Sequence, residues 1–511
     1  MDLQWLSLVA TMWLQSINGT NSNFPAYSSE LKRILSISQL RLNNLASASD
    51  AGKLLGWISG IAAAHFPLWL VLLIGSFLGL VGYGFQFLFL TNQVSLSYWH
   101  IFLLTVLAGN GICWINTVCY IIAIHSFPLD RQIAVSLSTS YVGLSAKLYT
   151  SIVDVVAPTS AGERAKLFLL LNSVLPLIVC TVAAPIARDV DGQKSRKLTR
   201  GFSTMFVITI VTGLFAVVTS LGSVGSRFMP QYVVLVGMIV VLFLPLVVPV
   251  VERIRERVQQ KCLIRVHDEG FATMESGEKS SDVQRDVVEI GVVEEIGAKM
   301  MVRRVEFWLY FFVYLFGATL GLVYLNNLGQ IAESRGCSGI SSLVSLSSAF
   351  GFFGRLLPSL LDYFFPKSKH VCSRAGAMGA TMAPMCGAFF LLLNTHDVSL
   401  YASTAVIGIC TGAITSISVS TTVELFGTKN FGVNHNVVVS NIPIGSFLFG
   451  DFAALLYKRG SNNASGEGNC IGEKCYQTSF IIWGSLCVVG TLLAFILHAR
   501  TKKLMHSHNR I

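Results

Sequence analysis

Apolar runs long enough to cross a bilayer recur along the whole chain. A hydrocarbon core about 30 Å thick needs roughly 20 apolar residues in one helix. Such runs are predicted at 5–28, 42–66, 68–91, 98–125, 132–156, 165–187, 203–222, 229–251, 305–328, 341–365, 375–394, 398–423, 435–457 and 477–499. The pattern therefore predicts an all-α membrane protein with about 14 transmembrane helices.

One long polar segment divides these helices. Residues 252–304 are charged, basic at first and then acidic, and such a composition cannot bury enough apolar surface to order itself. We interpret this segment as a cytosolic linker. The predicted organisation is a six-helix half at 1–190, two additional helices at 191–251, the linker at 252–304, a second six-helix half at 305–500 and a cytosolic tail at 501–511.

A short internal repeat supports two related halves. Gly52-Lys53-Leu54-Leu55 in the second helix matches Gly354-Arg355-Leu356-Leu357 in the tenth, and Gly19 and Gly321 each stand 33 positions before the glycine of the motif. Many transporters consist of two such halves with the substrate site between them. The helices at 203–222 and 229–251 then form an inserted pair.

The excess of basic residues fits membrane topology better than nucleic-acid binding. The formal net charge is +10, but the basic residues cluster in short loops between apolar runs, which is typical of cytosolic loops. The loops after the sixth and tenth helices and the tail all fall on one side if the N-terminus is cytosolic. We therefore expect both termini in the cytosol, a lipid bilayer around the helices and no nucleic-acid partner.

The loop at 458–475 gives an independent indication of sidedness. Asn463-Ala464-Ser465 is a glycosylation sequon, and Cys470 and Cys475 lie in the same loop, where we expect a disulfide. Both features suit an oxidising exterior. They favour the plasma membrane, with the vacuolar or mitochondrial membrane as alternatives.

Several stretches resemble a known plant family. The first part resembles the nodulin-like domain of plant major facilitator proteins, and the later part is similar to the nuclear-fusion-defective type of the same family. The matching stretches are 13–19, 27–28, 137–150, 424–427, 431–436, 442–446 and 449–451, together with the Cys470/Cys475 loop. This resemblance implies a major facilitator fold of two six-helix halves in a plant membrane protein, and it does not name the solute.

More distantly, the arrangement resembles monocarboxylate and oxalate/formate carriers. Those carriers use an arginine in the second helix of the C-terminal half, and Arg355 matches its placement. Monocarboxylate members place an acidic residue four positions earlier, where Gly351 stands here. Asp362 falls at the acid of the cytosolic loop motif, a gate motif of the superfamily, whereas the N-terminal copy has Gly60.

Ionisable residues inside apolar spans are functional candidates because an unpaired charge there costs several kcal/mol. Lys147 and Arg355 indicate an anionic or zwitterionic substrate, and the alternative interpretation is that each belongs to an internal ion pair. Lys53 and Asp50, one helical turn apart, are interpreted as a structural ion pair. Asp451 is the candidate for proton coupling, since burial raises the pKa of a carboxyl.

Two further polar positions are given structural interpretations. Asp154 is expected to be solvated at the outer rim. His435, with Asn436, is expected to open a helix at the cytosolic face as a capping or interfacial residue, although a titrating histidine would also suit transport.

The first helix contains a polar run where hydrocarbon is expected. Such polarity is tolerated only where it faces protein or water. It therefore lines a central pathway or forms hydrogen bonds that close the bundle. The pathway interpretation includes Asn18, Thr20, Asn21, Asn23, Tyr27, Tyr141, Tyr149, Asn326 and Asn327.

No motif for a phosphate loop, a zinc site or a nucleophile elbow is present in the sequence. We therefore expect no enzymatic activity, no cofactor and no metal. The leading hypothesis is a monomeric secondary active or facilitative transporter of a small polar or anionic, organic acid-like solute that works by alternating access, with protons as the candidate coupling ion. The alternative is a membrane sensor or scaffold with the carrier fold that signals through the linker.

Overall fold

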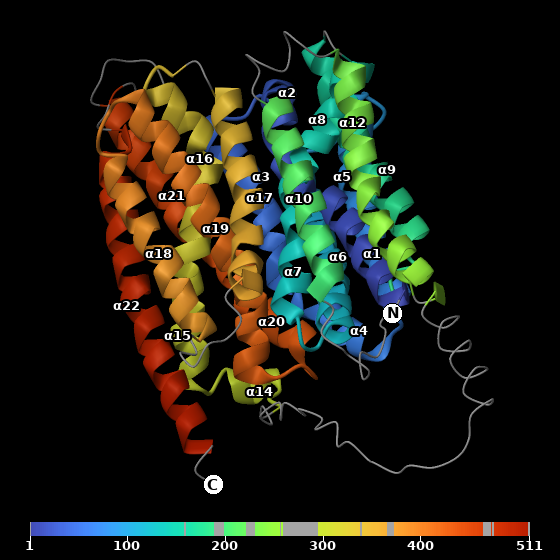
Figure 1. Ribbon diagram of the computed structural model, residues 1–511. Coiled ribbons are helices and arrows are strands. Elements are labelled where there is room, and N and C mark those ends of the chain that lie inside the picture. Colours follow the sequence, from blue (N-terminus) through green and yellow to red (C-terminus); the bar gives the residue numbers. More distant parts are fainter. Residues whose placement is uncertain are drawn as a thin grey trace, which may run out of the picture.

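The computed structural model describes residues 2–157, 160–188, 199–220, 230–255, 257–258, 295–337, 340–364, 373–462, 472 and 475–508. All regular secondary structure in these residues is helical. Figure 1 shows two groups of helices side by side, with both termini at the same end of the bundle. We call this end the inner end, which the charge pattern predicts to be cytosolic, and the opposite end the outer end.

The N-terminal half contains six helical segments, three of which are interrupted. The unbroken ones are α5 (Leu68–Leu90), α6 (Tyr98–Ser126) and α9 (Ala161–Ala183). The first segment consists of α1 (Asp2–Asn18), the 3₁₀ turn η1 (Thr20–Asn23) and α2 (Phe24–Leu35). The second consists of α3 (Gln39–Ala51), the 3₁₀ turn η2 (Gly52–Leu55) and α4 (Trp57–His65). The fifth consists of α7 (Arg131–Ser140), the 3₁₀ turn η3 (Tyr141–Leu144) and α8 (Ser145–Val156).

The C-terminal half repeats this plan. A short helix, α14 (Ala298–Met301), precedes it at the inner end (Figure 1). The half itself comprises α15 (Val305–Tyr314) with the π-turn η5 (Leu315–Thr319) and α16 (Leu320–Ser334), then α17 (Ile340–Phe364), α18 (Arg374–Leu391), α19 (Asp397–Phe426), α20 (Phe431–Val439) with α21 (Asn441–Asn462), and α22 (Gln477–His508).

The predicted inserted pair corresponds to two helices that pack on both halves. They are α10 (Thr199–Ser220) and the span Gln231–Arg255, which begins with α12 (Gln231–Phe243) and η4 (Leu244–Leu246). α10 contacts α17 of the C-terminal half and α7 of the N-terminal half, and α12 contacts α8. The Trp13 indole also donates a hydrogen bond to the Leu242 carbonyl at 2.8 Å.

Within the described residues, ten helices are long and apolar enough to cross a membrane. The predicted spans 5–28, 42–66, 132–156 and 375–394 coincide with helices that fall outside this set, and 3₁₀ turns interrupt the first three of them. The all-helical fold class is confirmed, and the number of fourteen crossings stays a prediction. The predicted linker lies mostly outside the described residues.

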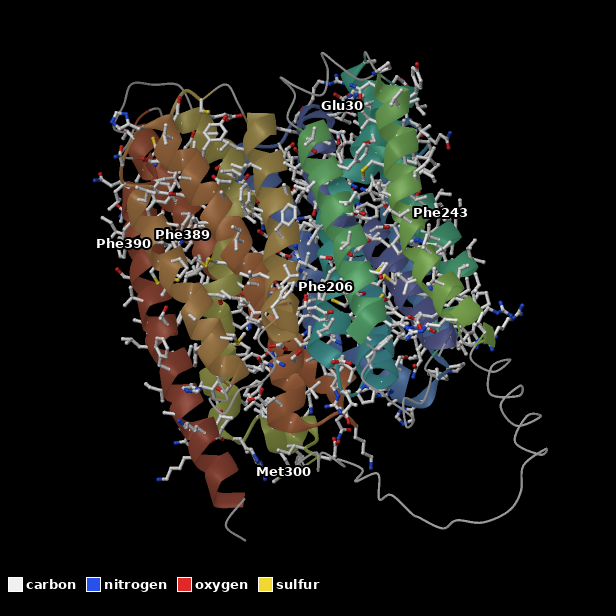
Figure 2. The ribbon with its side chains drawn as sticks, in the orientation of Figure 1. Glu30, Phe206, Phe243, Met300, Phe389 and Phe390 are labelled. Atoms are coloured by element: carbon white, nitrogen blue, oxygen red, sulfur yellow. The ribbon has the colours of Figure 1, made fainter. Side chains whose placement is uncertain are left out.

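Large apolar side chains lie both in the interior of the bundle and on its exterior. Phe389 is fully buried inside the C-terminal half, whereas its neighbour Phe390 is 40% exposed on the outer face of α18 (Figure 2). Phe243 of α12 is likewise exposed on the outer face of the bundle. Helices of a membrane bundle show such an apolar exterior because lipid, rather than water, surrounds them.

One buried cluster joins the halves. It includes residues of α1, α6, α7 and α10 and adds Phe352 and Leu356 of α17 with Val419 and Val423 of α19. Phe206 of α10 also packs against Tyr363 of α17, with ring centroids 5.3 Å apart. The hydrophobic interior is therefore continuous between the halves, on the side where the inserted pair packs.

The repeated glycine motif has a physical basis in both halves. A Cβ at Gly52 would lie 2.7 Å from the Gly109 carbonyl carbon of α6, and a Cβ at Gly354 would lie 2.8 Å from the Ile409 Cα of α19. In each half the second segment therefore crosses the fourth at backbone contact. Small residues permit such crossings in membranes, where van der Waals packing drives helix association.

Replacing Gly354 with alanine should lower the melting temperature in detergent, because the added methyl group displaces the α19 backbone. Overpacking of this kind costs about 1–3 kcal/mol. Gly387→Ala is the matched control, since its Cβ would meet nothing within 4 Å. Equal melting temperatures for Gly354→Ala and the wild type would contradict the close crossing.

Candidate substrate pathway between the halves

At the inner end, polar groups of the two halves are in direct contact. The Ser136 hydroxyl of α7 and the Ser416 hydroxyl of α19 form a hydrogen bond of 2.7 Å. The Asn436 amide of α20 donates to the Thr117 hydroxyl of α6 at 2.9 Å. These bonds are buried and connect residues about 300 positions apart in the chain, so they hold the halves together at this end.

Gly60 explains why the N-terminal gate motif lacks an acid. A Cβ at this position would lie 2.5 Å from the Gly432 carbonyl oxygen, because α4 and α20 approach at backbone distance. The C-terminal counterpart Asp362 instead forms an ion pair with Arg374 at 2.7 Å. Gly60 therefore serves a contact between the halves, whereas Asp362 serves a contact within one half.

Asp50 connects the halves further toward the outer end. One of its carboxylate oxygens accepts from the Lys53 ammonium at 2.6 Å, as the predicted ion pair requires. The other accepts from the Ser446 hydroxyl of α21 at 2.8 Å and, more weakly, from the Asn326 amide of α16 at 3.5 Å. Asp50 itself is only 4% exposed, so one buried carboxylate joins three helices from both halves.

A second polar bridge lies beyond Asp50. The Gln330 amide of α16 donates to the Asn43 side chain of α3 at 3.0 Å, and the Tyr476 hydroxyl donates to Gln330 at 2.7 Å. The halves therefore touch through hydrogen bonds near both ends.

Arg355 lies between the halves without a carboxylate partner among the described residues. Its guanidinium donates to the Gly351 carbonyl of its own helix at 3.3 Å. Tyr120 of α6 and Tyr314 of α15 are the residues that interact with it electrostatically. The side chain is densely surrounded, yet it retains accessible surface. This combination is expected of a cation that faces an internal, hydrated space.

Aromatic and polar groups extend this cationic site. The His435 ring lies 5.5 Å from the Tyr120 ring and stacks on Phe431 at 5.2 Å. Its Nδ1 lies 3.0 Å from the Thr422 hydroxyl, which also contacts the Tyr310 hydroxyl at 3.1 Å.

The prediction that His435 opens and caps a helix is wrong. α20 begins at Phe431, after Gly427 reverses the chain with a φ of 83°, and Asn430 occupies the N-cap position. His435 therefore lies one turn inside the helix and is buried. The predicted boundary at 435 missed the first turn of this helix.

Most of the polar run in the first segment forms hydrogen bonds within the N-terminal half. The Asn18 amide donates to the Asn116 side chain at 3.0 Å, and the Asn23 amide donates to Asn172 at 2.8 Å. The Tyr149 hydroxyl donates to the Ile17 carbonyl. For these residues the contacts favour hydrogen bonding that closes the bundle, the second of the two interpretations.

The other pathway candidates have mixed surroundings. Thr20 and Tyr27 are buried in the N-terminal half and Asn21 is half-buried, while Tyr141 packs against Phe352 of α17. Asn326 is exposed and reaches Asp50, but Asn327 is buried and donates to the Val323 carbonyl of its own helix at 2.8 Å. Among these candidates, Asn326 and Tyr141 lie at the interface between the halves.

Lys147 lies apart from Arg355. Its ammonium donates to the Thr219 carbonyl of α10 at 2.9 Å. Lys147 lines a cavity of about 610 Å³, and Arg355 is not among the residues that line this cavity. Asp154, expected to be solvated, instead forms an ion pair of 2.7 Å with Arg164. The sequence placed the two cations in one pathway, and the structure gives them different surroundings.

The remaining predicted residues lie toward the outer end. Asp451 is half-buried on α21, near Tyr98. Cys475 is disulfide-bonded, and its predicted partner Cys470 lies outside the described residues, as does Asn463.

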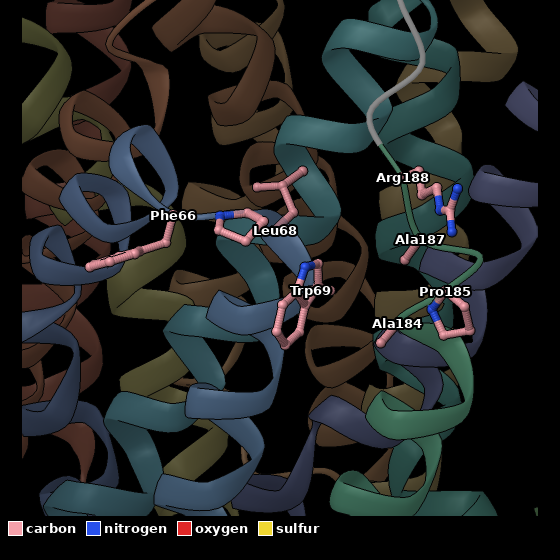
Figure 3. A pocket seen from close by; sticks show the side chains of 8 residues that line it. Phe66, Leu68, Trp69, Ala184, Pro185, Ala187 and Arg188 are labelled. Carbon is pink, nitrogen blue, oxygen red and sulfur yellow. The ribbon is translucent and has the colours of Figure 1, made fainter.

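A larger cavity of about 700 Å³ lies away from the interface. It is lined by the start of α5 and the end of α9, including Phe66, Trp69 and Arg188 (Figure 3). Its walls are mainly apolar and belong to the N-terminal half alone, so it takes no part in the contacts between halves.

The fold and the polar interface define a class of protein. The chain is similar to the solved structure of the proton:xylose symporter XylE, with a TM-score of 0.59 and 12% identity over 96% of this chain and 95% of that one. It is also similar to a proton-dependent oligopeptide transporter, with a TM-score of 0.57 and 12% identity over 99% and 100%. The protein is thus a multi-pass membrane protein with the major facilitator fold.

The sequence comparisons narrow this class. The nodulin-like family model matches residues 4–250, and the model of the NFD4 C-terminal domain matches residues 289–507. Protein NUCLEAR FUSION DEFECTIVE 4 of Arabidopsis thaliana is 36% identical over 98% of this chain and 90% of its own length. The chain belongs to this nodulin-like, nuclear-fusion-defective family of the major facilitator superfamily.

A more distant similarity is confined to part of the chain. A probable transporter MCH1 of Gibberella zeae is 25% identical over 38% of this chain and 40% of its own length.

Gly60→Ala should open the inner end more often, because its methyl group collides with the α20 backbone. A cysteine at Ser416, which is buried in the contact with α7, should then react faster with a membrane-impermeant maleimide applied from the inner side. Gly450→Ala is the control, since its Cβ would meet nothing within 4 Å. An unchanged labelling rate would show that the α4–α20 contact does not limit opening.

Proposed function

We propose that this protein is a secondary transporter that moves a small anionic solute across the membrane by alternating access. The observation that carries the proposal is Arg355, a cation between the halves with no carboxylate partner in the described part of the chain. A guanidinium offers a planar set of donors that suits a carboxylate or a phosphate. An anionic solute would supply the missing counter-charge.

The contacts around this site support alternating access. Buried hydrogen bonds join the halves at the inner end through Ser136 and Ser416, and nearer the outer end through Asp50 and Ser446. Each set can separate while the other stays formed, because they lie on different pairs of helices. Rocking of one half against the other about a central site is the usual motion of such two-half carriers.

Arg355→Gln should reduce saturable anion uptake by about tenfold or more, because charge-assisted hydrogen bonds contribute roughly 1.5–3 kcal/mol. Arg355→Lys should retain part of the flux, since it keeps the charge but loses the planar fork. The measurement is uptake and counterflow in proteoliposomes across organic acids, phosphate esters, amino acids and sugars.

Arg33→Gln is the matched control, because Arg33 is exposed and paired with Glu30. Equal uptake by Arg355→Gln and the wild type would remove the binding site from the proposal. Absence of saturable flux for every solute class would remove transport itself.

Two carboxylates are candidates for proton coupling. Asp451 was predicted from the sequence and remains a candidate. The geometry favours Asp50, because its oxygens accept hydrogen bonds from both halves. Protonation would cancel its charge and weaken these bonds, and would therefore favour separation of the halves at this level. The facing groups are Lys53 on the same segment, Cys113 on α6, and the uncharged Asn326 and Ser446.

Asp50→Asn should abolish accumulation driven by an imposed pH gradient while leaving counterflow of the solute intact. A lone Lys53 charge would be costly after this change, so Asp50→Asn with Lys53→Met is the second variant. Asp451→Asn serves as the comparison and should keep the pH-driven component. The reverse pattern would assign coupling to Asp451 instead.

A further inference from the structure

The cavity beside Lys147 lies where three parts of the protein meet. Its walls come from α2, α8 and α9 of the N-terminal half, from α17 of the C-terminal half, and from α10 and α12 of the inserted pair. At about 610 Å³, it falls within the common range of small-molecule sites, about 300–1,000 Å³. We call this cavity the lateral chamber.

The inserted pair closes the lateral chamber. α10 packs across α17 so closely that a Cβ at Gly213 would lie 2.8 Å from Cδ1 of the Phe352 ring. α12 packs on α8 and, through Gly237, on the Phe215 ring of α10. Without these two helices, the seam between α8 and α17 would face the bilayer. The pair therefore converts an open seam into a chamber.

The chamber carries one uncompensated positive charge. Its charged lining residues, in the described part of the chain, are Lys147, Arg164 and Asp154. Arg164 and Asp154 neutralise each other in their 2.7 Å ion pair. Lys147 makes one hydrogen bond, to the neutral Thr219 carbonyl, whereas an ammonium has three donors. Asp154 also attracts Lys147 electrostatically, but two cations and one carboxylate leave a net positive charge, and the remaining donors of Lys147 can bind an anion.

Apart from its charged residues, the chamber is lined by apolar side chains on some walls and by uncharged hydroxyl and amide groups on others. The apolar walls include Phe168 of α9 and Val344 and Phe352 of α17. A fully hydrated ion would gain little from such walls, since apolar surface stabilises by excluding water. A ligand with an anionic head and an apolar body would satisfy both Lys147 and these walls.

We propose that the lateral chamber is a binding site for an amphipathic anion, whose carboxylate or phosphate head contacts Lys147 and whose apolar body lies along α17. Arg355 does not line this chamber, so the site is distinct from the central one and does not depend on the transport proposal. The head group belongs either to a soluble fatty-acid-like solute or to a membrane lipid.

The experiment has two arms that separate these sources, both with the full-length protein. In the first, scintillation proximity measures radiolabelled decanoate binding to protein in phosphatidylcholine nanodiscs, with decanol as the neutral competitor. In the second, native mass spectrometry compares retention of phosphatidic acid with that of phosphatidylcholine. Preference for the anion in either arm supports the site and identifies its source.

Lys147→Met should weaken anion binding by about tenfold or more, and Lys147→Arg should retain it. Ser348→Phe, which fills the chamber, should also abolish binding, and melting temperatures verify that each variant is folded. Lys166→Met should leave binding unchanged, because Lys166 is paired with Glu163 and does not line the chamber. Equal binding by wild type and Lys147→Met, or no preference for anions in both arms, would overturn the proposal.

Discussion

A charge placed in the hydrocarbon core costs several kcal/mol unless a partner or water compensates it, and this constraint organises the interface between the halves. Lys53 meets Asp50 at 2.6 Å and Arg164 meets Asp154 at 2.7 Å. Arg355 and Lys147 have no such carboxylate in the described part of the chain, and both lie where separate helical groups meet. The compensated charges hold helices together, and the uncompensated ones mark spaces in which an anion can be stabilised.

The fold was largely predictable because its determinants are local. The length of an apolar run identifies a membrane-spanning helix without reference to its neighbours. Gly52 and Gly354 lie at the close helix crossing of each half, where a side chain would not fit. The breaks within helices were harder to predict. The segment at 5–28 turns at Gly19 into a 3₁₀ turn, where the Gly19 N–H donates to the Ser145 hydroxyl and the Ile17 carbonyl accepts from the Tyr149 hydroxyl, so that side chains of α8 satisfy backbone groups at the break.

The candidate site was predictable only in its residue types. Arg355 and the Asp50–Lys53 pair follow from the rarity of charge in membrane helices. The bonds from Asp50 to Ser446 and Asn326 could not be predicted, since their partners are 396 and 276 positions away and are common polar residues. Tyr120 and Tyr314 were missed for a similar reason, because a tyrosine in an apolar run gives no signal until the fold places it beside a cation.

The asymmetry between the two gate motifs follows from which contact each one serves. In the C-terminal half, the ion pair of Asp362 and Arg374 joins the end of α17 to the start of α18. In the N-terminal half, the corresponding position packs against Gly432 of the other half, and a carboxylate there would have neither room nor a solvated surface. Asp50 belongs to the same segment and lies about one α-helical turn and one 3₁₀ turn from Gly60 toward the outer end. There it accepts the hydrogen bond from Ser446 of α21. One broken helix thus touches the opposite half through close packing at one level and through a carboxylate hydrogen bond at another. Because the two contacts differ in chemistry and involve different helices of the opposite half, a change at one level need not alter the other, and the alternating access that we propose requires such independence.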